Sequence, residues 1–212
     1  MRKILALVLV LLCVLCACRR AKSTADVPTV LSHAYSVSVA PFTQPTTVSD
    51  LITGNLPDSQ GLIPDEGLLT LDDVFRAVLA DSPGKRSFTY LTDIPRSNSV
   101  HVAAQPQALS RWVAYGKAHR ADLLLVPLVL DWHERKGSKA GVTESAQVRL
   151  AFYLIKVNAG TIQARSVFEE KQQALTENLL NIGTFIKRKG AWITATDLAT
   201  EGMYKAKKEF GL

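Results

Sequence analysis

The sequence has no cysteine after Cys18. Its three cysteines, Cys13, Cys16 and Cys18, all lie close to the amino terminus. A domain built from the later residues therefore has no thiol, which excludes disulfides, cysteine nucleophiles and cysteine-ligated zinc from that domain.

Long apolar runs are also absent once the segment 1–17 is set aside. No later run approaches the roughly 18 apolar residues that a membrane-spanning helix needs, so a polytopic membrane protein is excluded. The net charge of +6 falls to +4 without Arg2 and Lys3, and a charge of that size does not demand a nucleic-acid partner. The apolar fraction beyond that segment is about 43%, which is ordinary for a globular domain and excludes intrinsic disorder.

Common catalytic and nucleotide-binding motifs are missing too: Gly-x-Ser-x-Gly, the P-loop, Gly-x-Gly-x-x-Gly and His-Glu-x-x-His do not occur. Asp131 and His133 would share one face of a strand, which makes a pair of metal ligands geometrically possible. The alternative interpretation is a strand that becomes polar as it leaves the core. With no further ligand at fitting spacing, we expect no metal site, no cofactor and no catalytic residue. A hydrolase with a dispersed site stays open, because a catalytic triad can be scattered through a chain.

The segment 1–17 resembles the signal peptide of a bacterial lipoprotein. Arg2 and Lys3 precede Ile4–Leu15, an apolar stretch whose length suits secretion better than spanning. Residues 15–18 read Leu15-Cys16-Ala17-Cys18, which resembles a lipobox. This resemblance implies cleavage between Ala17 and Cys18, with a diacylglyceryl group and an N-acyl chain carried on Cys18. A plain cleaved signal and an uncleaved anchor helix are the alternatives.

Arg19 follows the lipidated position where an inner-membrane retention signal usually has aspartate. This resembles the sorting signal for the outer membrane, so we expect an outer-membrane lipid anchor in the cell envelope, facing the periplasm. The expected organisation is a signal peptide at 1–17, a lipidated cysteine with a polar tether at 18–33, and a single domain at 34–212.

Hydrophobic periodicity predicts a mixed α/β fold, with one sheet of four to five strands and helices packed on it. Thr70, with Asp73 three residues on, is the expected N-cap of the first helix, and Pro127 indicates a bulge or an irregularity partway along its strand. A capping box at Thr194 and Asp197 predicts the last helix, whose expected buried face is Ala195, Leu198, Ala199, Gly202, Met203 and Ala206. The expected strands cover 35–42, 87–91, 121–130, 147–157 and 161–171, the expected helices begin near 70, 107 and 195, and a long loop covers 43–69.

The order of these elements resembles a group of bacterial envelope lipoproteins. The residues that carry the resemblance are a first strand ending Val-Ala-Pro-Phe, the run Ala-Asp-Leu-Leu-Leu-Val, a hairpin closing on Asn-Ala-Gly, and a final amphipathic helix. The group includes the curli-secretion lipoprotein, the lipoprotein activator of a penicillin-binding protein, and the amino-terminal domain of TolB. A closer resemblance is to uncharacterised lipoproteins with strings like Gly54–Gly61 and Trp192-Ile-Thr-Ala. These resemblances imply a role in assembly, secretion or partner activation rather than catalysis.

Two segments are candidates for a partner surface. The polar loop 55–63 includes Asn55, Leu56, Asp58 and Gln60. The apolar segment 175–186, with Leu179 and Phe185, is either part of the core or a face for a partner or a second copy. The basic run at 187–189 is expected either to contact an anionic group or to be a solvated turn. The second half of the candidate surface is Leu179, Phe185, Lys187, Arg188, Lys189 and Trp192.

These observations favour a lipid-anchored, non-enzymatic module that binds another envelope protein or self-associates, with no nucleic-acid partner. An envelope hydrolase and a subunit of a secretion or appendage-assembly ring are the alternatives.

Overall fold

The computed structural model describes residues 36–81, 87–95, 106–138, 141–172 and 192–212. The strands are β1 Val37–Val39, β2 Phe88–Tyr90, β3 Leu123–His133, β4 Lys136–Gly137, β5 Val142–Glu144, β6 Gln147–Lys156 and β7 Thr161–Lys171. Five of them form one sheet in the order β2-β1-β3-β6-β7, and β4 and β5 form a separate two-stranded ribbon. In the sheet, β1 runs parallel to β2 and β3, whereas β6 runs antiparallel to β3 and to β7. The predicted fold class is confirmed.

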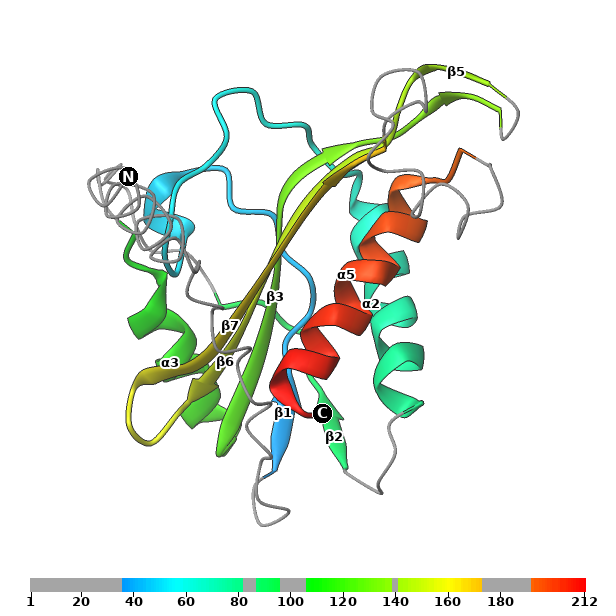
Figure 1. Cartoon of the computed structure of the whole chain (residues 1–212). Helices are drawn as coiled ribbons and strands as arrows, with labels where there is room; N and C mark the ends of the chain where they lie inside the picture. The colour runs from blue at the N-terminus through cyan, green and yellow to red at the C-terminus, as the bar shows by residue number, and fades with distance from the viewer. Residues whose placement is uncertain (1–35, 82–86, 96–105, 139–140, 173–191) are drawn as a thin grey trace, which may run out of the picture.

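Helices cover both faces of the sheet. α2 (Asp65–Ala80) and α5 (Ala195–Phe210) lie on one face, and α3 (Ala108–Ala118) lies on the other with the short 3-10 helix η1 (Val48–Asp50) (Figure 1). Two separate apolar clusters fill the spaces between these layers. Among the described residues, no helix is both long and apolar enough to cross a bilayer.

β3 is the central strand, and it is buried from Leu123 to Trp132 because helices cover both of its faces. The irregularity expected along this strand is present. Pro127 keeps its register with Phe152 of β6, and that register shifts two residues later, between Val129 and Asp131. On the other side, the parallel pairing stops at Val39 with Leu125 and resumes only at Thr43 with Leu128, so the missing N–H of Pro127 falls in a gap of the ladder.

The first helix starts earlier than predicted, at Asp65 rather than after Thr70. Pro64 occupies the N-cap position. Asp65 and Glu66 in the first turn place negative charge beside the positive end of the helix dipole, which stabilises the helix. The Thr70 hydroxyl donates to the carbonyl oxygen of Glu66 at 2.9 Å inside the helix, so it does not cap. The expected loop therefore ends at residue 64.

The last helix agrees with its sequence. The Thr194 hydroxyl accepts from the backbone N–H of Asp197, whose carboxylate accepts from the N–H of Thr194, so the predicted capping box is present. The residues predicted to face the core are buried: Ala195, Leu198, Ala199, Gly202, Met203 and Ala206.

Candidate functional site

Large apolar side chains exposed to solvent are few in the described part of the chain: Leu62, Leu69, Ile94 and Tyr204. Leu69 is 66% exposed and Ile94 is 54% exposed, and both line one cavity between α2 and the segment that follows β2. We call this cavity the apolar groove. Its volume is about 540 Å³. Its lining residues come from 39–42, from α2 and from 90–94: Val39, Ala40, Pro41, Phe42, Asp65, Leu68, Leu69, Asp72, Asp73, Phe75, Arg76, Tyr90, Leu91, Thr92 and Ile94.

The base of the apolar groove is aromatic and rigidly packed. The ring centroids of Phe42 and Phe75 lie 5.6 Å apart, and each ring also contacts Phe152 in the core. Phe42 and Phe75 are almost fully buried. The groove is therefore a surface continuation of the hydrophobic core, with Leu69 and Ile94 left on its edge.

One face of α2 forms a wall of the apolar groove. Leu69, Asp72, Asp73 and Arg76 follow at i, i+3, i+4 and i+7, so their side chains leave the helix on the same side. The buried stripe of the same helix is different and consists of Leu71, Phe75, Val78 and Leu79.

The charged groups of this wall are mostly acidic. Asp65, Asp72 and Asp73 line the groove with a single cationic side chain, Arg76. The Asp72 carboxylate accepts from the backbone N–H of Phe42 at 2.7 Å and so ties α2 to the end of β1. Desolvation by burial raises the pKa of Asp72, although the Phe42 hydrogen bond acts in the opposite direction.

Arg76 spans from α2 to β2. Its guanidinium lies 4.8 Å from the ring centroid of Tyr90, and its Nη1 lies 3.8 Å from the Asp73 carboxylate. Because Arg76 is engaged with an aromatic face and one carboxylate, it offsets only part of the negative charge along the groove.

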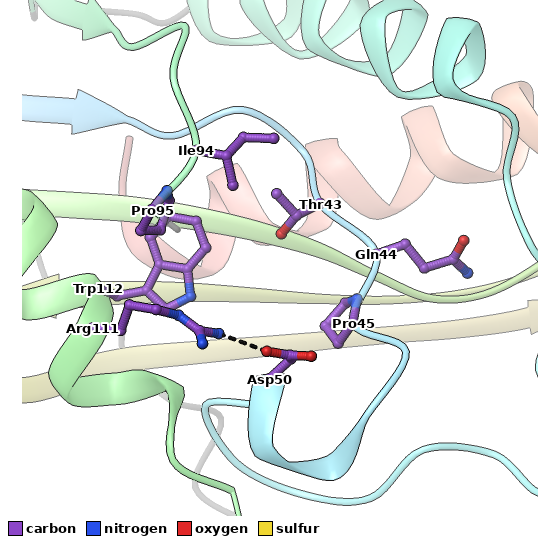
Figure 2. Close-up of a pocket in the computed structure, with 8 residues that line it drawn as sticks. All are labelled: Thr43, Gln44, Pro45, Asp50, Ile94, Pro95, Arg111 and Trp112. Atoms are coloured by element: carbon purple, nitrogen blue, oxygen red, sulfur yellow. Dashed lines mark hydrogen bonds and ion pairs between the residues drawn. The ribbon is translucent and has the colours of Figure 1, made fainter. Parts of the chain in front are cut away.

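A second cavity of about 400 Å³ adjoins the apolar groove, and Ile94 lines both (Figure 2). We call it the polar pocket. Its polar edge is an ion pair between Arg111 Nη2 and Asp50 Oδ1 at 3.0 Å, with both side chains 23% exposed. The Thr47 hydroxyl donates to the other oxygen of Asp50 at 2.7 Å. The residues of the polar pocket are Thr43, Gln44, Pro45, Asp50, Ile94, Pro95, Arg111 and Trp112.

Trp112 gives the polar pocket a hydrogen-bond donor that has no acceptor among the described residues. The side chain is buried on α3, with 3% of the residue exposed, and its indole Nε1 has no hydrogen-bond partner among the described residues. Figure 2 shows the indole in the wall of the pocket, between Pro95 and the Arg111–Asp50 pair. An unpaired buried donor is costly, so this N–H favours an acceptor from outside the described chain.

Residues 91–95 lie between the two cavities and are held by hydrogen bonds to β1 and to α3. The backbone N–H of Leu91 donates to the carbonyl oxygen of Val39, which extends the β1–β2 ladder. The Tyr115 hydroxyl donates to the backbone oxygen of Asp93 at 2.6 Å and lies 3.1 Å from its carboxylate, and His119 Nε2 lies 3.3 Å from the same carboxylate. Tyr115, Asp93 and His119 form what we call the Asp93 clamp, and this clamp positions Ile94 and Pro95.

The Asp93 clamp shifts the pKa values of both Asp93 and Tyr115. Desolvation acts to raise the pKa of Asp93, but the hydrogen bonds from its own backbone, from Tyr115 and from His119 hold it below its usual value. Burial and the nearby Asp93 carboxylate raise the pKa of Tyr115. Tyr115 therefore acts as a hydrogen-bond donor at physiological pH.

The polar loop proposed from the sequence as a partner surface is partly committed to the fold. Gln60 Nε2 donates to the carbonyl oxygens of Pro45 and Leu130, each at 2.9 Å, and Leu56 packs against the apolar cluster beneath α3. Asn55 and Asp58 are exposed. The loop as a partner surface stays a prediction that rests on these two exposed side chains.

The other half of that surface is described only at Trp192. Trp192 lines a cavity of about 470 Å³ with His133, Lys171 and the β5 region, and its carbonyl oxygen accepts from Arg135 Nη1 at 2.9 Å. The remaining predicted residues, Leu179, Phe185, Lys187, Arg188 and Lys189, lie outside the described residues, as do Ala17, Cys18 and the tether.

Asp131 and His133 share a face of β3, as their spacing predicts, with 3.1 Å between Asp131 Oδ1 and His133 Nε2. Asp131 is buried, and its two oxygens accept from the Gly61 N–H and from Gln147 Nε2. Glu134 accepts from the N–H of Ala195 at the start of α5. In the described residues, no group of three or more histidines, cysteines, aspartates or glutamates is placed to hold a metal ion. These polar side chains connect the end of β3 to its neighbours.

The residues of the apolar groove and the polar pocket were missed at the level of sequence. Placing the helix start at Thr70 assigned Leu69 to a loop, where an exposed leucine is unremarkable. With the helix started at Asp65, Leu69 is an apolar residue off the buried stripe, and that pattern would have indicated a second contact face. Ile94 and Trp112 carry no such local signal, because only the tertiary fold brings them together.

No protein-family model and no curated protein sequence matches this chain. Solved structures with a similar fold include the PelC dodecamer from Paraburkholderia phytofirmans, which is 14% identical over 86% of this chain and 91% of that chain, with a TM-score of 0.45. The LpoB C-terminal domain from Salmonella enterica is 15% identical over 67% of this chain and 86% of that chain, with a TM-score of 0.34. TolB from Acinetobacter baumannii is 11% identical over 74% of this chain and 29% of that chain, with a TM-score of 0.29. LpoB and TolB belong to the group that the order of strands and helices resembles, and at this similarity they assign no function.

Proposed function

We propose that this chain is a lipid-anchored envelope protein whose α/β domain is a non-enzymatic module that binds another envelope protein through the apolar groove. The anchor is the lipid on Cys18, which holds the domain at the outer membrane on the periplasmic side. The observation that carries the binding role is the pair Leu69 and Ile94, exposed along a groove whose base is part of the core.

The energetic reason is the apolar surface that these two side chains leave in water. Full burial of one leucine or isoleucine side chain contributes about 1.5–3 kcal/mol. Because Leu69 is 66% and Ile94 is 54% exposed, covering the rest of both contributes about 2–4 kcal/mol, a quarter to a half of the roughly 8 kcal/mol of a micromolar affinity. The aromatic base supplies a preformed pocket of the kind that anchor residues of a partner fill. The Asp93 clamp keeps Ile94 in place before the partner arrives, which lowers the ordering cost of binding.

The test is quantitative co-purification of partners with the full chain from detergent-solubilised envelopes. Leu69→Asp and Ile94→Asp are the test variants, and Leu62→Asp is the matched control, because Leu62 is 65% exposed and lines neither cavity. We expect both test variants to lose the partner by more than tenfold, with Leu62→Asp unchanged. Equal recovery with all three variants would contradict the proposal, and loss of self-association instead would identify a second copy as the partner.

A further inference from the structure

The charges along the apolar groove restrict what can occupy it. Asp65 and Asp73 are exposed carboxylates on its α2 wall, and Asp72 adds a third beside the N–H of Phe42. Arg76, the single cation of the lining, is already stacked on Tyr90. An acidic segment or an anionic lipid headgroup would meet like charge here, whereas a lysine or arginine would meet opposite charge.

The polar pocket adds a directional requirement. Trp112 Nε1 is a donor only, so whatever satisfies it must bring an acceptor. The Arg111 guanidinium in the same pocket is held by Asp50 at 3.0 Å, which leaves the pair close to neutral. A neutral acceptor such as a backbone carbonyl therefore suits this pocket better than a second carboxylate.

The two cavities meet at Ile94, so one continuous ligand can reach both. We propose that the occupant is a short extended segment of a partner protein, in which a large apolar side chain enters the apolar groove, a neighbouring lysine or arginine pairs with Asp65 and Asp73, and a backbone carbonyl accepts from Trp112 Nε1. This inference rests on the proposed function, since it specifies the chemistry of the partner at the same groove.

The probes are two sets of short capped peptides in a serine and glycine background. In the first set each peptide carries one leucine flanked by two lysines, and in the second set glutamate replaces both lysines. Binding to the full chain in detergent is measured by fluorescence anisotropy, with the labelled peptide at low and high salt.

We expect the lysine peptides to bind at least tenfold more tightly than the glutamate peptides, with an affinity that falls as salt rises. The double variant Asp65→Asn/Asp73→Asn lowers that affinity about three- to tenfold, because two exposed ion pairs are lost. Asp81→Asn is the control, since Asp81 is an exposed carboxylate that lines neither cavity. Equal binding of the two peptide sets, binding of neither, or an equal loss in Asp81→Asn would overturn the inference.

NMR tests the contact between the peptide carbonyl and Trp112. On saturation with a lysine peptide, we expect the indole N–H resonance of Trp112 in the wild-type chain to move downfield, while the resonances of Trp132 and Trp192 stay in place. Trp112→Phe identifies the resonance and lowers affinity about five- to tenfold. An unmoved Trp112 resonance at saturation contradicts the contact, and this measurement needs no variant that could misfold.

If Leu69→Asp and Ile94→Asp still abolish partner recovery while the glutamate peptides bind as tightly as the lysine peptides, the proposed function stands and this inference fails.

Discussion

At Gly61 the fold leaves no room for a side chain. A Cβ atom at this position would lie 2.1 Å from the carbonyl oxygen of Trp132 and 2.9 Å from the His133 ring. The backbone of Gly61 also donates to Asp131 at 2.7 Å and accepts from the Trp132 N–H at 3.2 Å. The loop can therefore approach the end of β3 only without a side chain here.

We predict that Gly61→Ala destabilises the protein by about 2–3 kcal/mol, because the loop must move and its two backbone bonds must lengthen. Urea unfolding measures the change. Gly141→Ala is the control, since a Cβ at Gly141 meets nothing within 4 Å. Equal stabilities of the two variants would show that the loop moves freely away from β3.

At the scale of single residues, the sequence predicted the positions that obey a local rule. The Thr194–Asp197 capping box and the shared face of Asp131 and His133 are such cases, because each depends on spacing alone. Lys207 was not predicted, because a lysine in the last turn of a helix normally reaches solvent. Its burial is explained only by the carbonyl groups of another helix.

Lys207 joins two helices. Its Nζ donates to the carbonyl oxygens of Val78 at 2.8 Å and Asp81 at 2.9 Å, both at the carboxyl end of α2. These carbonyls have no partner within the helix, and a cation beside them also opposes the negative end of the helix dipole. α5 thus caps α2 while packing against it.

We expect Lys207→Met to cost about 2 kcal/mol of folding stability, since methionine retains most of the apolar stem but leaves both carbonyls without the ammonium group. Thermal and urea unfolding give the value. The exposed neighbour Lys208 provides the comparison, and Lys208→Met should change stability by less than about 0.5 kcal/mol. A Lys207→Met protein as stable as wild type would mean that water replaces the ammonium group without cost.

The Asp93 clamp makes the segment between the two cavities sensitive to acid. The folded-state pKa of Asp93 is depressed, so its carboxylate contributes stability that is fully present above the unfolded value of about 3.9. That contribution is lost as the pH falls through the depressed folded value. Tyr115 remains protonated throughout, because its pKa is raised.

The prediction is that wild type is more stable than Asp93→Asn above about pH 4, and that the difference shrinks as the pH is lowered further. Urea unfolding of both proteins from about pH 2 to about pH 7, a range set by that ordinary aspartate pKa, tests it. Tyr115→Phe should also speed amide hydrogen exchange at residues 91–94 at neutral pH. A stability difference that stays constant down to the lowest pH would rule out the carboxylate as the group responsible.

At the scale of elements, sequence periodicity predicted all five strands of the main sheet and the face that α5 buries. It placed the start of α2 wrongly because Thr70 and Asp73 imitate a capping box, whereas Pro64 begins the helix without any side-chain cap. The irregularity expected along the strand of Pro127 is present, but its side could not be predicted. Pro127 keeps its register with β6 and lies where the pairing with the β1 segment is interrupted, and that depends on the assembled sheet.

The whole molecule combines a proposed lipid anchor with a proposed binding domain. The lipid anchor is an expectation from the segment that ends at Cys18, and the binding domain is argued from the groove beside α2. Neither the groove nor the polar pocket could be predicted from the sequence, since each combines residues from segments that are distant along the chain.

The anchor is tested by Cys18→Ala. We predict that metabolic labelling with a fatty acid marks the wild-type protein and not the variant, because the Cys18 thiol is the proposed acceptor of the lipid. Cys16→Ala is the matched control and should be labelled like wild type. Label retained in Cys18→Ala would show that another group carries the lipid.

Photocrosslinking in living cells from single positions of the full chain tests directly whether a partner binds at the apolar groove. A photoreactive amino acid replaces Leu69 or Ile94 in the groove, and in the control it replaces Leu62, which is as exposed as Leu69. We predict a discrete crosslinked protein from both groove positions and none from Leu62. Crosslinks of equal yield from all three positions, or crosslinks from Leu62 alone, would contradict it.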